Sequence, residues 1–134
     1  MLQVPQDCLE QTLVHLRAAL PNEGVGLWAG QRGQVMQVWP LENIHAIPQL
    51  RYEADPQALL EALQRFEAGG LELVAIYHSH PAGPARPSET DCSQAFWRVP
   101  YAIFAMQTGE LRAYWLPEGE EVLVQIEAAA GYKP

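Results

Sequence analysis

The chain has 134 residues, the size of one ordinary domain, and 49% of them are hydrophobic. Such a chain can bury a core without disulfide bonds or a structural metal, so we expect one globular domain over residues 1–134. The net charge of −8 has the wrong sign for attraction to nucleic acid or to an anionic membrane surface, and we expect neither as a partner.

The start of the chain and its cysteines bear on the cellular compartment. Residues 1–10 have neither the basic start nor the apolar stretch of a secretory signal. No apolar run approaches the roughly 20 residues of a membrane-spanning helix. Cys8 and Cys92 form neither a CxxC nor a zinc-finger spacing, which favours free thiols in a reducing compartment. We therefore expect a cytoplasmic protein.

The first predicted element is a helix, because leucines recur at spacings of four, three and four residues and so line one face: Leu9, Leu13, Leu16 and Leu20. Pro21 ends this helix. Residues 24–30 and 34–39 are short apolar or alternating runs separated by Gln-Arg-Gly, and they predict a hairpin. Residues 40–50 hold two prolines and an asparagine, which predicts a loop, followed by a short extended piece at 51–53.

A second helix and a buried strand follow in the middle of the chain. Asp55 precedes Pro56, as an N-cap residue does before a first-turn proline. The buried face of this helix is predicted to comprise Leu59, Leu63 and Phe66. The pair Gly69-Gly70 ends it. Residues 71–80 (LELVAIYHSH) are rich in β-branched and aromatic residues, and their apolar centre predicts a strand buried on both faces.

The last third of the chain begins with a rigid loop, because residues 81–87 contain three prolines and a glycine. Ser88 begins a third predicted helix, over about residues 88–97. Three strand-like runs follow, at 101–107, 110–116 and 121–127. The sequence contains no internal repeat and no linker, so it predicts one α/β (α+β) domain with mostly strands and about three helices.

A histidine pair lies at the end of the predicted buried strand. Successive side chains on a strand face opposite ways, so His78 and His80 share one face and Ser79 takes the other. Two imidazoles placed in this way can bind one metal ion. An isolated His-x-His is more often not a ligand pair, so the interpretation depends on the residues downstream.

The segment Ser88-Glu89-Thr90-Asp91 allows two compatible interpretations. One is a capping box, in which Ser88 and Asp91 satisfy free backbone N–H groups at the start of the helix. In the other, Asp91 also points back at the strand end and supplies a third, anionic ligand beside His78 and His80. Two histidines and one carboxylate, with a fourth position left for water, are typical of catalytic rather than structural zinc.

A hydrolytic zinc site also needs a proton acceptor, and Glu23 is the candidate. It lies between the predicted first helix and the following strand, from where a carboxylate could reach a cleft. Glutamate in a loop is ordinarily a solvated acid. Sequence spacing alone does not bring Glu23 to the metal ligands.

These residues together resemble the signature of the JAMM (MPN+, or JAB) zinc metalloproteases. That signature has an upstream glutamate, here Glu23, and then His78-Ser79-His80. Seven residues separate this pair from Ser88, and two more lie before Asp91. The stretch LPNEGVGLWAG around Glu23 also resembles the family pattern Asn-Glu-x-x-Gly-Leu-x-x-Gly. The chain lacks the insertions of the deubiquitinating members, so it is similar to the compact bacterial and archaeal type.

The resemblance implies a fold and a set of roles. The fold would be a mixed, mostly antiparallel, curved β-sheet flanked by about three helices, the MPN/JAB (cytidine-deaminase-like) fold. One Zn²⁺ per chain would bind His78, His80 and Asp91. Glu23 would act as general base, and Ser88 would donate a hydrogen bond to the tetrahedral oxyanion.

The resemblance also implies a substrate class. The enzyme would be a metallopeptidase or isopeptidase that cleaves after the C-terminal Gly-Gly tail of a ubiquitin-like protein of the sulfur-carrier (ThiS/MoaD) type, or of its conjugates. The particular carrier and the type of bond are left open, as is the choice between monomer and homodimer.

Three rival functions remain open at this level. They are a zinc hydrolase of small peptidyl or cysteinyl amides, a non-catalytic MPN scaffold module and a DNA-repair-associated protein. The scaffold usually loses metal ligands that this chain keeps. The negative charge and the lack of a basic patch disfavour the DNA-repair role.

Overall fold

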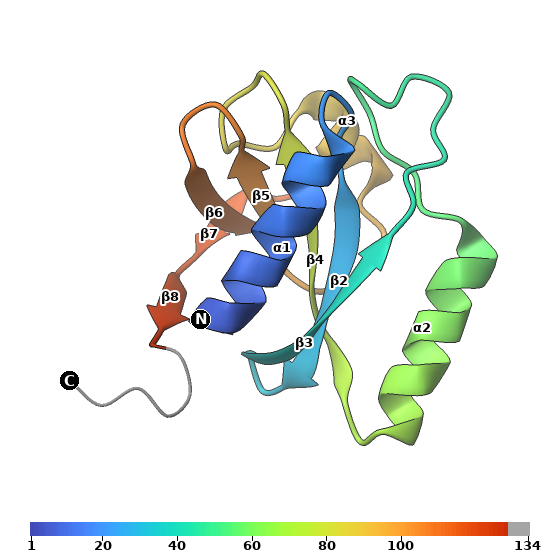
Figure 1. The fold of residues 1–134 in the computed structure, drawn as a ribbon, viewed down its shortest axis with the longest axis vertical. Helices are drawn as coiled ribbons and strands as arrows, with labels where there is room; N and C mark the ends of the chain where they lie inside the picture. The colour runs from blue at the N-terminus through green and yellow to red at the C-terminus, as the bar shows by residue number, and fades with distance from the viewer. Residues whose placement is uncertain (129–134) are drawn as a thin grey trace.

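A computed structural model describes residues 1–128 of the chain. In chain order the elements are β1 (Leu2–Pro5), α1 (Gln6–Ala19), β2 (Val25–Gln31), β3 (Gln34–Leu41), α2 (Pro56–Ala68), β4 (Glu72–His80), α3 (Glu89–Gln94), β5 (Tyr101–Ala105), β6 (Glu110–Trp115), β7 (Glu120–Val122) and β8 (Val124–Glu127) (Figure 1). Among these elements, no helix has both the length and the apolar character needed to cross a membrane.

All the strands named above belong to one mixed sheet, in the order β7-β6-β5-β4-β2-β3-β1-β8. The pairs β2–β3, β2–β4, β5–β6 and β6–β7 are antiparallel, and the other three pairs are parallel. β7 and β8 are consecutive in the chain but lie at opposite ends of this order. The segment 120–127 therefore joins the two edges of the sheet, and the sheet must curve strongly. This confirms the mixed, curved sheet that the motif implied.

The helices cover opposite faces of the sheet (Figure 1). α1 buries Cys8 and Leu16 in the same cluster as Trp28 and Tyr77. α2 contributes Ala62 and Phe66 to a second cluster on the other face, together with Ile76, Ile103 and their neighbours. β4 lies between β5 and β2, and its residues 74–80 are all buried, as the sequence predicted. The histidine pair therefore lies at the carboxyl end of a central strand.

Two predicted elements differ most from the structure, and one strand was not predicted. α3 ends at Gln94 rather than near 97. The hydroxyl of Tyr101 accepts the N–H groups of Phe96 and Trp97, at 3.3 and 3.1 Å, and this replaces helical bonding there. The run at 121–127 forms two strands, which pair with different neighbours. β1 was not predicted, because four residues are too few for a periodic signal.

β2 and β4 pack so closely at Gly26 that a larger residue there is expected to destabilise the protein. Gly26 pairs with Tyr77, and a Cβ atom at Gly26 would lie 2.2 Å from the tyrosine ring. Tyr77 is fully buried and its hydroxyl lies 2.8 Å from Nδ1 of His15, so the ring cannot shift without losing that contact. We expect Gly26→Ala to lower the free energy of unfolding by about 1–3 kcal/mol, measured by urea denaturation.

The control for this substitution is Gly69→Ala at the exposed end of α2. There the nearest atom to an added Cβ lies at 3.5 Å, an ordinary van der Waals contact. We expect this variant to stay within about 0.5 kcal/mol of the wild type. Equal losses in the two variants would show that the contact with Tyr77 is not the cause.

Candidate metal centre

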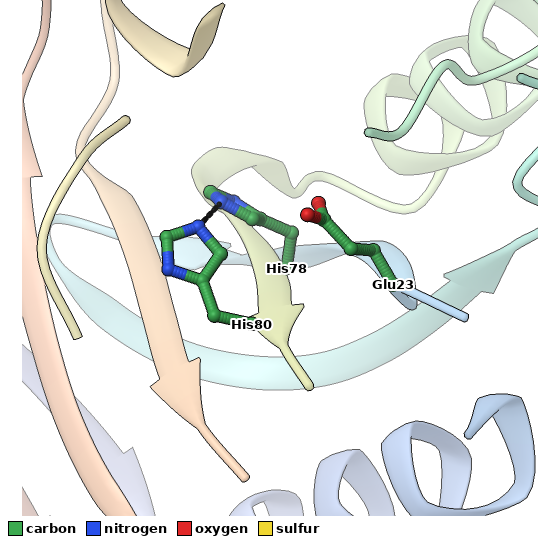
Figure 2. Close-up of side chains that lie close together, drawn as sticks. All are labelled: Glu23, His78 and His80. Carbon is green, nitrogen blue, oxygen red and sulfur yellow. Dashed lines mark hydrogen bonds between the residues drawn. The ribbon is translucent and has the colours of Figure 1, made fainter. Parts of the chain in front are cut away.

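His78 and His80 project from the same face of β4, as the period of two predicts (Figure 2). Their exposed fractions are 0% and 8%, and their Nε2 atoms lie 3.2 Å apart. Ser79 takes the opposite face, where its Oγ accepts the N–H of Gly24 at 2.8 Å. The two imidazoles therefore lie side by side on one face of β4. On the other face, Ser79 binds the backbone of the segment just before β2.

Asp91 completes the cluster from the first turn of α3. Its Oδ2 accepts the N–H of Ser88 at 2.9 Å, and Oγ of Ser88 accepts the N–H of Asp91 at 3.0 Å, so the predicted capping box is present. The same Oδ2 lies 3.2 Å from Nε2 of His78 and 3.0 Å from Nε2 of His80. The two interpretations of this segment are therefore geometrically compatible, because one oxygen atom serves both contacts.

The three side-chain atoms can be tested against the geometry of a bound ion. Their mutual separations are 3.2, 3.2 and 3.0 Å. Ligand atoms on tetrahedral zinc, with bonds of about 2.0–2.1 Å, lie roughly 3.3 Å apart. The donor set and its spacing therefore fit an ion of this size.

The two imidazole rings are oriented by different contacts. Nδ1 of His80 lies 2.7 Å from the carbonyl oxygen of Pro84. A carbonyl only accepts hydrogen bonds, so Nδ1 carries a proton. Nε2 faces Asp91 and, once it has given up its own proton, offers its lone pair to a metal ion. The ring of Tyr52 stacks on His78, with a centroid distance of 4.5 Å and an interplanar angle of 29°. The packing of Tyr52 thus fixes the plane of the more deeply buried histidine.

Glu23 lies between α1 and β2 and is only 6% exposed. One of its carboxylate oxygens and one ring nitrogen of each histidine, His78 and His80, lie within 4.8 Å of one another. Its carboxylate points toward His78 (Figure 2). Oε1 of Glu23 is buried without a hydrogen-bond partner among the described residues. The structure therefore brings together a carboxylate and a histidine pair that lie far apart in the sequence.

The surroundings shift the pKa values of Glu23 and Asp91 in opposite directions. Burial, aided by the charge of Asp91, raises the pKa of Glu23 to about 7, although His80 acts in the opposite direction. Burial also acts to raise the pKa of Asp91, but hydrogen bonds from His78 and His80 outweigh it and hold that pKa well below the usual range. Asp91 is thus a permanent anion, while Glu23 can take up or release a proton near neutral pH.

Two hollows reach the cluster from different sides. The proline-loop hollow, of about 500 Å³, is lined by Glu23, His80, Ser88 and most of the loop 81–87. The apolar hollow, of about 190 Å³, reaches Asp91 between α2 and α3, and its lining includes Leu27, Tyr52, Ile76 and Trp97. Leu50 lines both hollows. The cluster is therefore buried but borders two hollows through which a ligand could reach it.

Sequence reasoning missed three contributors to this site. Tyr52 was placed only in an extended piece, and nothing in its neighbours indicates a stack on His78. The contact of Pro84 uses a main-chain carbonyl, which no residue type reveals. Asn43 donates to the carbonyl oxygen of Glu23 at 2.9 Å. The sequence, and its resemblance to the family, placed Asn43 in the loop before the second helix, but neither indicated this hydrogen bond.

The chain matches one family over most of its length. The sequence profile of "Prokaryotic homologs of the JAB domain" matches residues 5–117. A "Probable TtuB-protein conjugate cleaving protease" of Thermus thermophilus is 54% identical over 126 residues, covering 94% of this chain and 83% of that protein. A desampylase of Haloferax volcanii is 31% identical over 134 residues, covering 94% of this chain and 96% of that protein.

A solved structure is similar over nearly the whole chain. Protein DSY2949 from Desulfitobacterium hafniense superposes with a TM-score of 0.87 at 30% identity, covering 98% of this chain and 96% of that one. This chain belongs to the prokaryotic JAB family. The resemblance drawn from Glu23, the histidine pair and the Ser88–Asp91 segment is thereby confirmed at the level of the family.

The raised pKa of Glu23 predicts how the metal-free protein responds to pH. Between the ordinary value of 4.5 and about 7, the folded state keeps a proton that the unfolded chain releases. The free energy of unfolding therefore falls as the pH rises through this range. The full difference corresponds to about 3 kcal/mol. We expect the chelator-treated wild type to lose stability relative to Glu23→Gln between pH 4.5 and 7, measured by urea denaturation. Parallel curves would contradict a protonated, buried Glu23.

Proposed function

We propose that this chain is a zinc-dependent isopeptidase that hydrolyses the amide bond after the C-terminal Gly-Gly tail of a ubiquitin-like sulfur-carrier protein or its conjugates. Residues 1–134 would form a single catalytic domain acting in the cytoplasm. The observation that carries the proposal is the convergence of two imidazole nitrogens and one carboxylate oxygen beside Glu23, whose Oε1 has no hydrogen-bond partner in the described part of the chain. The names of the relatives, a conjugate-cleaving protease and a desampylase, support the substrate class.

The metal would be a single Zn²⁺ held by His78, His80 and Asp91. A zinc ion in such a site supplies Lewis acidity, which lowers the pKa of a bound water to about 7 and polarises a carbonyl group. The protein contributes ligands that need little rearrangement. His80 is already oriented by Pro84, and His78 by Tyr52.

Glu23 would act as the general base and then as the general acid. Its carboxylate faces the histidine pair, and among the described residues its buried Oε1 has no hydrogen-bond partner that would compete with a water molecule. A pKa of about 7 lets it accept a proton from the attacking water and return that proton to the leaving amine. Asp91, whose pKa is far lower, would stay ionised through both steps.

Ser88 would stabilise the oxyanion of the tetrahedral intermediate. Its Oγ accepts the N–H of Asp91, which orients the hydroxyl, while the hydroxyl proton remains available to a substrate. Ser88 also lines the proline-loop hollow, together with Glu23 and His80. The capping bond would thus hold the donor at one wall of this hollow before substrate arrives.

The burial of the cluster supports a glycine at the cleaved position. His78, His80 and Asp91 are each at most 8% exposed. A residue with a bulky side chain could not bring its carbonyl carbon close to them without displacing the walls of the hollow. Glycine has no side chain and an adaptable backbone, so a Gly-Gly tail could enter in extended form.

The test of this function is Glu23→Gln, assayed with ubiquitin-like proteins fused or conjugated through a Gly-Gly tail. The substitution keeps the size of the side chain but removes the proton acceptor. We expect about one zinc per chain in both proteins, with cleavage by the variant lowered by about 10²–10⁴-fold. Metal analysis and gel-based cleavage measure the two quantities. Zinc without cleavage of any such fusion by the wild type would move the function to small amides or to a scaffold. Absence of zinc after reconstitution would overturn the site itself.

Ser88→Ala tests the oxyanion donor. We expect kcat to fall by about 10²–10³-fold with little change in KM, because the donor acts in the transition state. Loss of the cap also costs about 1 kcal/mol of stability, so activity is expressed per zinc-loaded folded molecule. The control is Ser93→Ala on the same helix, where the hydroxyl donates only to the carbonyl oxygen of Thr90. A kcat for Ser88→Ala equal to that of the control would exclude the role.

A further inference from the structure

Asn43 lies just beyond β3 and joins several backbone groups through one planar amide. Its Nδ2 donates to the carbonyl oxygens of Glu23 at 2.9 Å and Arg51 at 3.0 Å, with a longer contact to Pro48 at 3.4 Å. Its Oδ1 accepts the N–H groups of His45 at 3.0 Å and Glu53 at 3.1 Å. The side chain of Asn43 therefore ties the loop at 44–53 to the segment that carries Glu23.

The peptide group after Glu23 is held from both sides. Its carbonyl oxygen accepts from Asn43, and its N–H, which belongs to Gly24, donates to Oγ of Ser79. The N–H of Glu23 itself donates to the carbonyl oxygen of Pro48 at 2.7 Å. By contrast, Oε1 of the Glu23 carboxylate has no hydrogen-bond partner among the described residues. The hydrogen bonds described for Glu23 therefore hold its backbone, from which the carboxylate extends toward the histidine pair.

The same amide also fixes the ring that covers His78. Asn43 bonds to Arg51 on one side of Tyr52 and to Glu53 on the other. Tyr52 itself stacks on His78 at a centroid distance of 4.5 Å. Asn43 therefore links the segment that carries the Glu23 carboxylate to Tyr52, whose ring packs on His78. Its own hydrogen bonds in this network go to backbone groups.

We propose that Asn43 is a positioning residue, which holds the carboxylate of Glu23 and the ring of Tyr52 in register with His78 during hydrolysis. This inference rests on the proposed function. Asparagine suits the position because one planar group must donate two hydrogen bonds and accept two. Aspartate has nearly the same shape but no donor, and it would place an oxygen against the carbonyl of Glu23. Alanine removes the whole network without adding a charge.

The experiment compares zinc-loaded wild type with Asn43→Asp and Asn43→Ala. We expect kcat to fall about 10–100-fold in both variants, because a displacement of the base by about 1 Å costs up to 10²-fold. KM should stay within about twofold, and kcat is expressed per bound zinc, with the zinc content of each variant measured alongside. Amide hydrogen exchange at Glu23 and Gly24 should accelerate at least tenfold in the zinc-loaded variants.

The matched control is His45→Ala in the same loop. It removes the bond from the N–H of Ile47 to Nδ1 of His45, which does not reach Glu23. We expect kcat and exchange at Gly24 to remain within twofold of the wild type. A purely structural role for Asn43 would lower thermal stability and zinc content while leaving kcat per bound zinc unchanged, and that result would overturn the proposal.

The exchange readout separates this inference from the proposed function. If the wild type cleaves no Gly-Gly fusion, the proposed function fails. Faster exchange at Glu23 and Gly24 in the Asn43 variants would still support the positioning of this segment by Asn43. Unchanged exchange would overturn the inference whatever the activity.

Discussion

The site depends on a single buried carboxylate oxygen. Oδ2 of Asp91 accepts the backbone N–H of Ser88 and lies 3.0–3.2 Å from both imidazoles. The N-terminus of α3 can therefore occupy only one place relative to the end of β4. Since the loop at 81–87 connects these two elements and contains three prolines, the chain between them has few conformations to lose on folding. The capping box and the histidine pair thus fix one another.

Burial gives the two carboxylates of the site opposite properties. Both are largely removed from water, which by itself disfavours a negative charge. Asp91 has hydrogen bonds from its neighbours to offset this cost, whereas within residues 1–128 Glu23 has none at its buried Oε1. The difference in partners, more than the difference in burial, makes one group a permanent anion and the other a group that exchanges protons near pH 7.

The sequence predicted those parts of the site that depend on short-range geometry. The shared face of His78 and His80 follows from the period of a strand, and the Ser88–Asp91 contacts follow from the first turn of a helix. The approach of Glu23 could not be derived in this way, because it requires β2 to pair with β4 in the register that sets Val25 opposite His78. β1 escaped prediction for a similar reason, since it is four residues long and pairs in parallel with β8 from the other end of the described chain.

The proposed metal ligands are close together in the sequence, whereas Glu23 is distant from them, so the two parts of the site need not assemble together. The proposed ligands lie within residues 78–91, so few residues must be ordered to bring them together. The proposed base, Glu23, comes from a distant segment and meets them only when the sheet has formed and Asn43 and Ser79 have bound the peptide group after Glu23. A partly unfolded chain could therefore hold a metal ion without the proton acceptor beside it. Hydrolysis would then be confined to the fully folded protein, where β2, β4 and the loop at 44–53 are all in place.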